Sequence, residues 1–109
     1  MEKESLSVSF LTEGDTLTAN LSGEIDHHSA APVRQAIDAA IFKHRPRVLT
    51  LGLGDVSFMD SSGLGLVLGR VALCQEIGAS VRLARPSLRV RKVLAVAGIE
   101  RLENLTVEA

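Results

Sequence analysis

Apolar and polar residues alternate over two segments near the start of the chain. In residues 5–12, Leu6, Val8 and Phe10 fall on one face, and residues 16–23 repeat the same period of two. The turn-forming sequence EGD separates the two segments. Strict alternation is typical of half-buried strands, so this part of the chain predicts a β-hairpin.

Helical spacing of the apolar residues begins after the hairpin. Residues 29–44, 62–77 and 86–97 each repeat apolar side chains along one stripe, which predicts three helices. Ser29 can cap the start of the first helix. Gly98 follows the last apolar turn of the third helix, where glycine commonly ends a helix.

Short apolar runs lie between and after these helices. Residues 47–53 are almost continuously apolar, as is typical of a strand covered on both faces. Residues 80–84 predict another short strand, and residues 104–109 predict a weak closing strand. The predicted order is therefore β-β-α-β-α-β-α-β. This alternation predicts one α/β domain over residues 1–109, in which helices pack against a mixed, partly parallel sheet.

The composition fits a single soluble, cytoplasmic domain. The 109 residues are 46% hydrophobic, which is enough for one core. With a net charge of −1 and only three aromatic residues, the chain lacks the basic face and the stacking side chains of nucleic-acid-binding proteins. No apolar run approaches the ~20 residues of a membrane helix, and no signal peptide is evident. The single Cys74 excludes an internal disulfide and is expected to be buried and inert.

The sequence DSSG, between a predicted strand and a predicted helix, is the main candidate site. Asp60, Ser61 and Ser62 all belong to the residue types that cap helices by accepting backbone N–H bonds. A cap needs only one of them, so at least one hydroxyl should face solvent. That hydroxyl would lie at the carboxyl end of a strand, where ligands and partners usually meet α/β sheets.

Enzymatic and cofactor chemistry has weaker support. Neither serine has a glycine two residues before and two residues after it, as a nucleophile elbow requires, although the DHH sequence could supply a base for a triad. The spacing of GLGLVLG departs from both nucleotide-binding fingerprints. His27 and His28 are adjacent, so their side chains should diverge, and His44 has no cysteine nearby. We therefore expect no metal and no cofactor.

Covalent modification of a serine fits the physical chemistry best. A phosphate at a helix N-terminus meets free backbone N–H groups and the positive end of the helix dipole. It would add about 1.5 to 2 negative charges at pH 7 to a surface that already holds Asp60. A partner that recognises this surface would then be repelled. From these residues alone, Ser61 and Ser62 are equal candidates.

Two motifs resemble a known family. GEIDHHSA (residues 23–30) and FMDSSGLGLVLGR (residues 58–70) resemble the bacterial anti-sigma-factor antagonists of the sporulation type, which are STAS domain proteins. The resemblance implies that the protein binds an anti-sigma factor with serine kinase activity and frees a sigma factor, without being an enzyme itself. The kinase would inactivate it using ATP, and a serine phosphatase would restore it. The residue after the motif aspartate, here Ser61, would carry the phosphate.

The resemblance also implies a partner-binding surface around Ser61. We expect Asp26, His27, Asp60, Ser62 and Gly63 to contribute to it. Asp26 either joins Asp60 in an acidic rim that pairs with basic groups of the partner, or only caps the following helix. The alternative function is a STAS binding module in a stress-signalling assembly or in transporter regulation.

Helical periodicity adds two residues to this surface. The stripe expected to face the sheet comprises Leu64, Val67, Leu68 and Val71. Leu66 and Arg70 lie roughly opposite that stripe. We expect them to be exposed and to contact the anti-sigma factor, since contiguous exposed apolar residues often mark a binding face. The alternative is that this second stripe packs on a neighbouring helix.

Overall fold

A computed structural model describes residues 5–108 of the chain. Its elements in chain order are β1 (Ser7–Glu13), β2 (Thr16–Ile25), α1 (Ala30–His44), β3 (Val48–Met59), α2 (Ser61–Glu76), β4 (Ser80–Ala84), α3 (Leu88–Val96), the short 3-10 helix η1 (Ile99–Arg101) and β5 (Leu105–Glu108). The predicted order of strands and α-helices is confirmed. The additional element η1 begins directly after Gly98, whose φ of 68° is the left-handed conformation that glycine adopts readily.

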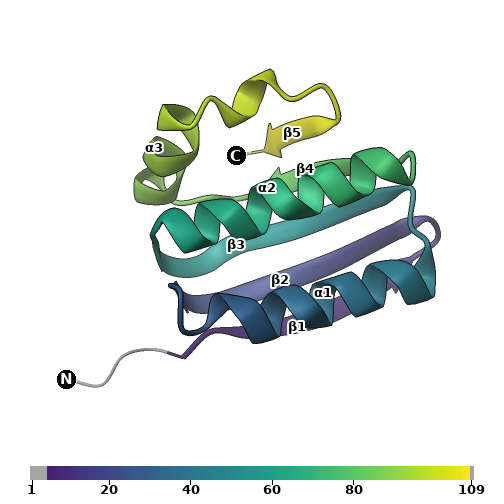
Figure 1. Cartoon of the computed structure of the whole chain (residues 1–109), viewed down its shortest axis with the longest axis horizontal. Coiled ribbons are helices and arrows are strands. Elements are labelled where there is room, and N and C mark those ends of the chain that lie inside the picture. Colours follow the sequence, from purple (N-terminus) through teal and green to yellow (C-terminus); the bar gives the residue numbers. More distant parts are fainter. Residues whose placement is uncertain (1–4, 109) are drawn as a thin grey trace.

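The five strands form one mixed sheet in the order β1-β2-β3-β4-β5. The hairpin strands β1 and β2 are antiparallel, whereas β2, β3, β4 and β5 are parallel neighbours. Each parallel connection runs through a helix, and α1 and α2 lie side by side over the sheet (Figure 1). The carboxyl ends of β2 and β3 therefore meet at the same edge of the sheet, and this edge carries the candidate site.

The core lies between the sheet and the helices. Along β2 every second residue is buried, from Leu17 to Ile25, and the buried residues of all three helices join these side chains in one cluster. Polar residues on the other sheet face lie in register across the strands, with Thr18 beside Thr50 and Thr50 beside Arg82. Thr50 and Gly52 on this other face are nevertheless buried, as are Leu49, Leu51 and Leu53, so the expectation of a strand covered on both faces is confirmed for these five residues. The leucines of β3 face the helices, and threonine and glycine alternate with them.

Two other expectations about apolar residues have mixed outcomes. Phe10 is 40% exposed although it belongs to the predicted apolar face, because β1 is an edge strand. Cys74 is fully buried, as expected, and this burial raises the pKa of its thiol to about 11. Within residues 5–108, no helix has the length and apolar character needed to cross a membrane.

Candidate functional site

The two sequence motifs meet at the carboxyl edge of the sheet. Ile25, the last residue of β2, lies in register with Met59, the last residue of β3. The backbone N–H of Asp60 donates to the carbonyl of Ile25 over 3.3 Å, which joins the two strand ends. The DHH and DSSG sequences follow these strands directly and therefore lie next to each other, as the parallel arrangement requires.

Asp60 is the N-cap of α2. Its Oδ1 accepts hydrogen bonds from the backbone N–H of Ser62 over 2.8 Å and of Gly63 over 3.3 Å. One residue thus supplies the whole side-chain cap, as the sequence interpretation allowed. Ser61, the first residue of the helix, is exposed, whereas Ser62 is half-buried. Exposure therefore distinguishes two serines that residue type alone left equal.

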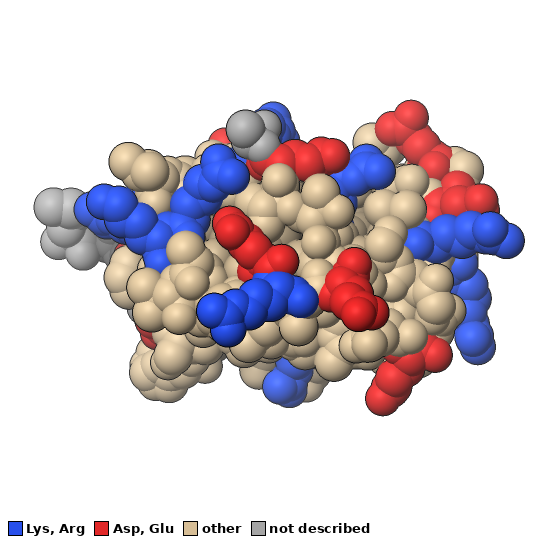
Figure 2. All heavy atoms as spheres, turned by 90° about the horizontal axis from the view of Figure 1, so that it is seen from above, with Lys and Arg blue, Asp and Glu red and all other residues tan. Residues whose placement is uncertain are grey.

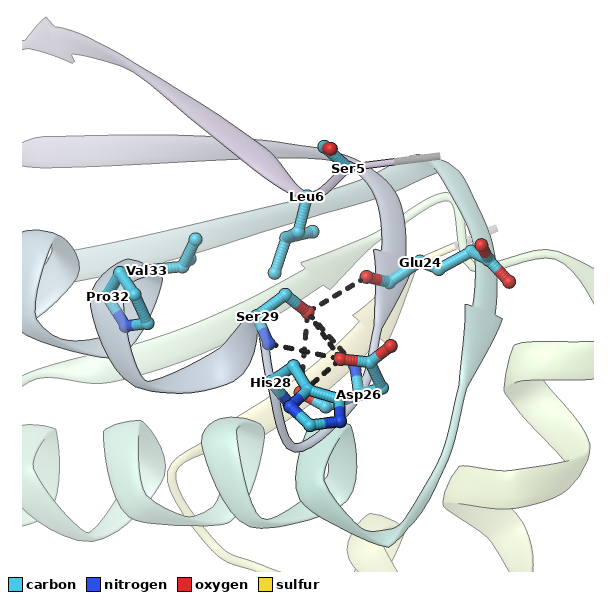
Figure 3. A pocket seen from close by; sticks show the side chains of 8 residues that line it. All are labelled: Ser5, Leu6, Glu24, Asp26, His28, Ser29, Pro32 and Val33. Atoms are coloured by element: carbon cyan, nitrogen blue, oxygen red, sulfur yellow. Dashed lines mark hydrogen bonds between the residues drawn. The ribbon is translucent and has the colours of Figure 1, made fainter. Parts of the chain in front are cut away.

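Asp26 organises the turn before α1 and faces inward (Figure 3). Its Oδ1 accepts hydrogen bonds from the backbone N–H groups of His28 and Ser29 over 2.9 and 3.0 Å, and from the Ser29 hydroxyl over 3.1 Å. Asp26 is only 5% exposed. The acidic rim is therefore wrong for this residue, and the alternative of a turn aspartate at the start of the helix holds.

Ser29 does not cap α1 as expected. Its hydroxyl lies within hydrogen-bond distance of the carbonyl oxygens of Glu24 (3.1 Å) and Asp26 (3.3 Å) and makes no cap bond to the helix. The physical reason is that Ser29 has the backbone angles of a helical residue (φ −96°, ψ −22°) where a capping residue is extended, and Pro32 in the first turn has no N–H to donate. The Ser29 hydroxyl then binds the turn to the end of β2 (Figure 3).

The exposed Ser61 and its neighbour open onto two hollows. Ser62 lines a hollow of about 330 Å³ between α1 and α2 together with His27 and Arg34. Ser61 lines a groove of about 530 Å³ between the start of α2 and α3 together with Lys92. The structure thus brings His27 close to the serines. The sequence interpretation missed α3 as part of the site, although its run of basic residues was visible.

The two adjacent histidines lie closer together than expected. The ring centroids of His27 and His28 are 3.9 Å apart, so the expectation that these side chains diverge is wrong. Over residues 5–108, no group of three or more His, Cys, Asp or Glu side chains is arranged to hold a metal ion. The site consists instead of exposed hydroxyl, imidazole and basic groups around a capped helix start.

Leu66 and Arg70 are buried, which corrects the expectation that they form an exposed face. Leu66 is 3% exposed and Arg70 is 7% exposed, whereas Leu68 of the supposed sheet-facing stripe is 37% exposed. The reason is the position of α1, which lies directly beside α2 (Figure 1). Because α2 packs on both the sheet and α1, it buries side chains over a wider part of its circumference than the sheet alone would cover. Leu66 and Arg70 therefore pack against the neighbouring helix, which was the alternative expectation.

Arg70 is held in this helix interface by an ion pair. Its Nε lies 2.8 Å from Oδ1 of Asp38 on α1. Burial lowers the pKa of the Arg70 guanidinium below its ordinary value, and the nearby Asp38 carboxylate partly offsets that effect. Arg70 therefore joins the two helices, and the exposure on which its predicted role in partner binding rested is absent.

Gly63 is a packing residue of the site. It is buried, and a Cβ atom built on it would lie within 3.0 Å of Ile25 Cγ2 and would overlap the side chain of Met59. The absence of a side chain therefore lets the first turn of α2 sit directly on the ends of β2 and β3. Gly65 lies two residues further along the same helix, where a Cβ would meet no atom within 4 Å.

These two glycines give a matched stability test. We expect Gly63→Ala to lower the free energy of unfolding by about 1–3 kcal/mol, because the added methyl overpacks the strand ends. Gly65→Ala should raise it by about 0.5–1 kcal/mol, because alanine favours the helix and fits the open space. Denaturant unfolding of both variants measures the two effects. Equal effects of the two substitutions would show that close packing at Gly63 does not set the helix position.

Charge is unevenly distributed around the site. Between Arg85 and Ala97 the chain carries four basic residues and no acidic one. Lys and Arg side chains gather at the end of the molecule where α3 lies, while both signs mix over the rest of the face in view (Figure 2). The exposed Ser61 therefore lies between Asp60, which caps α2, and the basic helix α3.

The fold and this site define a STAS domain. The model of the STAS domain family matches residues 8–108, so the chain belongs to that family. Two relatives are both named anti-sigma F factor antagonist. The first, from Lysinibacillus sphaericus, is 40% identical over 78% of this chain and 73% of its own length. The second, from Paenibacillus polymyxa, is 37% identical over 76% of this chain and 71% of its own length.

Solved structures extend the similarity to the arrangement of the elements. The anti-sigma factor antagonist SpoIIAA in its unphosphorylated form is 32% identical, with a TM-score of 0.79 over 94% of this chain and 89% of its own. The phosphorylated form of SpoIIAA from Bacillus is 31% identical, with a TM-score of 0.71 over 96% of this chain and 92% of its own. The five-stranded mixed sheet with three α-helices is therefore shared with a protein known in two phosphorylation states.

Proposed function

We propose that this protein is an anti-sigma-factor antagonist that acts by binding and is switched off by phosphate on Ser61. Its unphosphorylated form binds an anti-sigma factor and frees the sigma factor which that protein holds. The observation that carries the proposal is the exposed Ser61 at the first position of α2, directly after the capping Asp60. Relatives named for this role and a structural relative known with and without phosphate support it.

The local structure suits a reversible phosphate. Asp60 already uses Oδ1 to bind two backbone N–H groups, so the α2 start stays capped whichever state Ser61 is in. The helix dipole stabilises an exposed anion at this end by about 0.3–1 kcal/mol. Phosphate would therefore change the charge of the surface without unfolding it. The protein would then be the substrate of a serine kinase and of a phosphatase, both acting in the cytoplasm.

The partner surface in this proposal comprises the exposed His27 and the half-buried Ser62 and Asp60 beside Ser61. His27 and Ser62 line the hollow toward α1, and Asp60 lines the groove toward α3. Asp26 and Gly63 contribute indirectly, because one fixes the turn that carries His27 and the other seats α2 on the strand ends. Leu66 and Arg70 are not part of this surface.

The site of phosphorylation is tested directly with the anti-sigma factor kinase of the same organism. We expect intact-mass spectrometry after incubation with the kinase and ATP to show one added phosphate, located at Ser61 by fragmentation. Ser61→Ala should take up none, whereas Ser62→Ala should still take up one phosphate at Ser61, because Ser61 is exposed and Ser62 is half-buried. Phosphorylation of Ser61→Ala at the normal rate would overturn the assignment.

A further inference from the structure

An apolar groove lies between the start of α2 and α3 and includes Ser61 in its wall. Its volume is about 530 Å³, and its walls include Met59, Ser61 and Leu64 on one side and Lys92, Val93 and Val96 on the other. Val96 is 91% exposed, and Leu88 on the same helix is 71% exposed. Helix α3 packs on the core through Val90 and Leu94. The exposed side chains of Leu88 and Val96 are not part of that packing.

The basic residues of α3 indicate the charge of whatever covers the groove. Arg89, Lys92, Val93 and Val96 follow one another at spacings of three, one and three, which places them along one side of the helix. Arg89 and Lys92 are both exposed. On the α3 side, an apolar side chain seated in the groove would therefore be flanked by these two cations, and carboxylates beside that side chain would complement them. Asp60 on the α2 side of the groove already accepts hydrogen bonds from the backbone of α2.

We propose that the anti-sigma factor docks in this groove through an aliphatic or aromatic side chain flanked by carboxylates. This inference rests on the proposed function and gives the partner chemistry for the same site. The groove is continuous with Ser61, so a partner positioned to modify that hydroxyl covers both. A second copy of this chain fits less well, because a two-fold contact through α3 would bring its cations against their own counterparts.

The proposal adds a second effect of phosphate. A phosphoryl group on Ser61 stands at the wall opposite Lys92 in the same groove. It therefore competes with the partner's carboxylates for that cation, besides repelling them. Loss of the Lys92 charge should weaken binding of the unphosphorylated protein in the same direction as the phosphate does.

Binding titrations with the purified anti-sigma factor of the same organism test the groove. Val96→Asp and Lys92→Glu should each bind about tenfold more weakly or worse. The binding of Lys92→Glu should also depend less on salt than that of the wild type. Matched controls lie on α1, where Phe42 is 54% exposed and Lys43 is in the last turn. Phe42→Asp and Lys43→Glu should bind within about twofold of the wild type.

The outcomes separate this inference from the proposed function. If the wild type binds the anti-sigma factor and both groove variants bind equally well, the groove is not the docking surface and the proposed function stands. If the wild type binds no anti-sigma factor, the proposed function itself fails. A wild type that self-associates in sedimentation, together with a monomeric Val96→Asp that binds the anti-sigma factor normally, would show that a second copy covers the groove and would overturn the inference.

Discussion

Ser61→Asp is expected to weaken binding to the anti-sigma factor by about 100-fold. An added carboxylate next to Asp60 would face the carboxylates proposed for the partner, and like charges at an interface cost several kcal/mol, of which each 1.4 kcal/mol is tenfold in affinity. Because aspartate carries less charge than phosphate, the phosphorylated protein should bind still more weakly. Isothermal titration of wild type and variant with the same anti-sigma factor measures the effect.

The same substitution should leave the melting temperature within a few degrees of the wild type. Ser61 is exposed, so no packing is lost, and the helix dipole offsets part of the repulsion from Asp60. Ser61→Asn is the matched control, since it has nearly the size of aspartate and no charge. Equal loss of binding by both variants would show that shape, and not charge, is recognised. An early melt of Ser61→Asp would show that the switch acts by unfolding.

Removing Asp38 is expected to destabilise the interface between α1 and α2 strongly. Asp38→Ala should lower the free energy of unfolding by about 2–3 kcal/mol, because it leaves the buried Arg70 charge without its carboxylate. The value lies below the range for fully buried pairs because the Asp38 side chain is 29% exposed. Chemical denaturation of the folded protein measures this difference.

Removing the other member of the ion pair, Arg70, should lower the free energy of unfolding by less. Arg70→Met removes the buried charge, fills similar space and leaves an aspartate that water can still reach. The double variant, which combines Asp38→Ala with Arg70→Met, should therefore be more stable than Asp38→Ala alone. Asp15→Ala is a control for an ion pair without burial, since Asp15 and Arg47 pair over 3.9 Å on the surface. A double variant that is less stable than Asp38→Ala would show that the guanidinium does not need its partner.

The order of elements and the place of the site could be predicted because both depend on local pattern. Alternation and helical stripes depend only on neighbours in sequence, and Asp60 acts as a cap through bonds to residues two and three positions away. A serine directly after a strand end is similarly placed by topology alone. These features needed no knowledge of how the helices lie relative to one another.

The roles of Asp26, Leu66 and Arg70 could not be predicted because they depend on that tertiary arrangement. Periodicity gives the angle between side chains on α2, but the buried arc is set by α1, whose position comes from the sheet order. Asp26 reads equally as a surface charge or a turn cap until its bonds to the backbone of His28 and Ser29 are seen. The groove at Lys92 joins Ser61 on α2 to Lys92 on α3, which are 31 positions apart in sequence, and no local pattern connects them.

The claim that charge on Ser61 controls partner binding is tested most directly by one titration series. The unphosphorylated protein, the protein phosphorylated at Ser61 and the same sample after phosphatase treatment are each titrated into the anti-sigma factor, with melting curves recorded in parallel. We expect the unphosphorylated protein to bind tightly and the phosphorylated protein to bind more than about 100-fold more weakly. Phosphatase treatment should restore tight binding, and all three samples should be folded. Equal affinity of the phosphorylated and unphosphorylated proteins would show that Ser61 is not the switch.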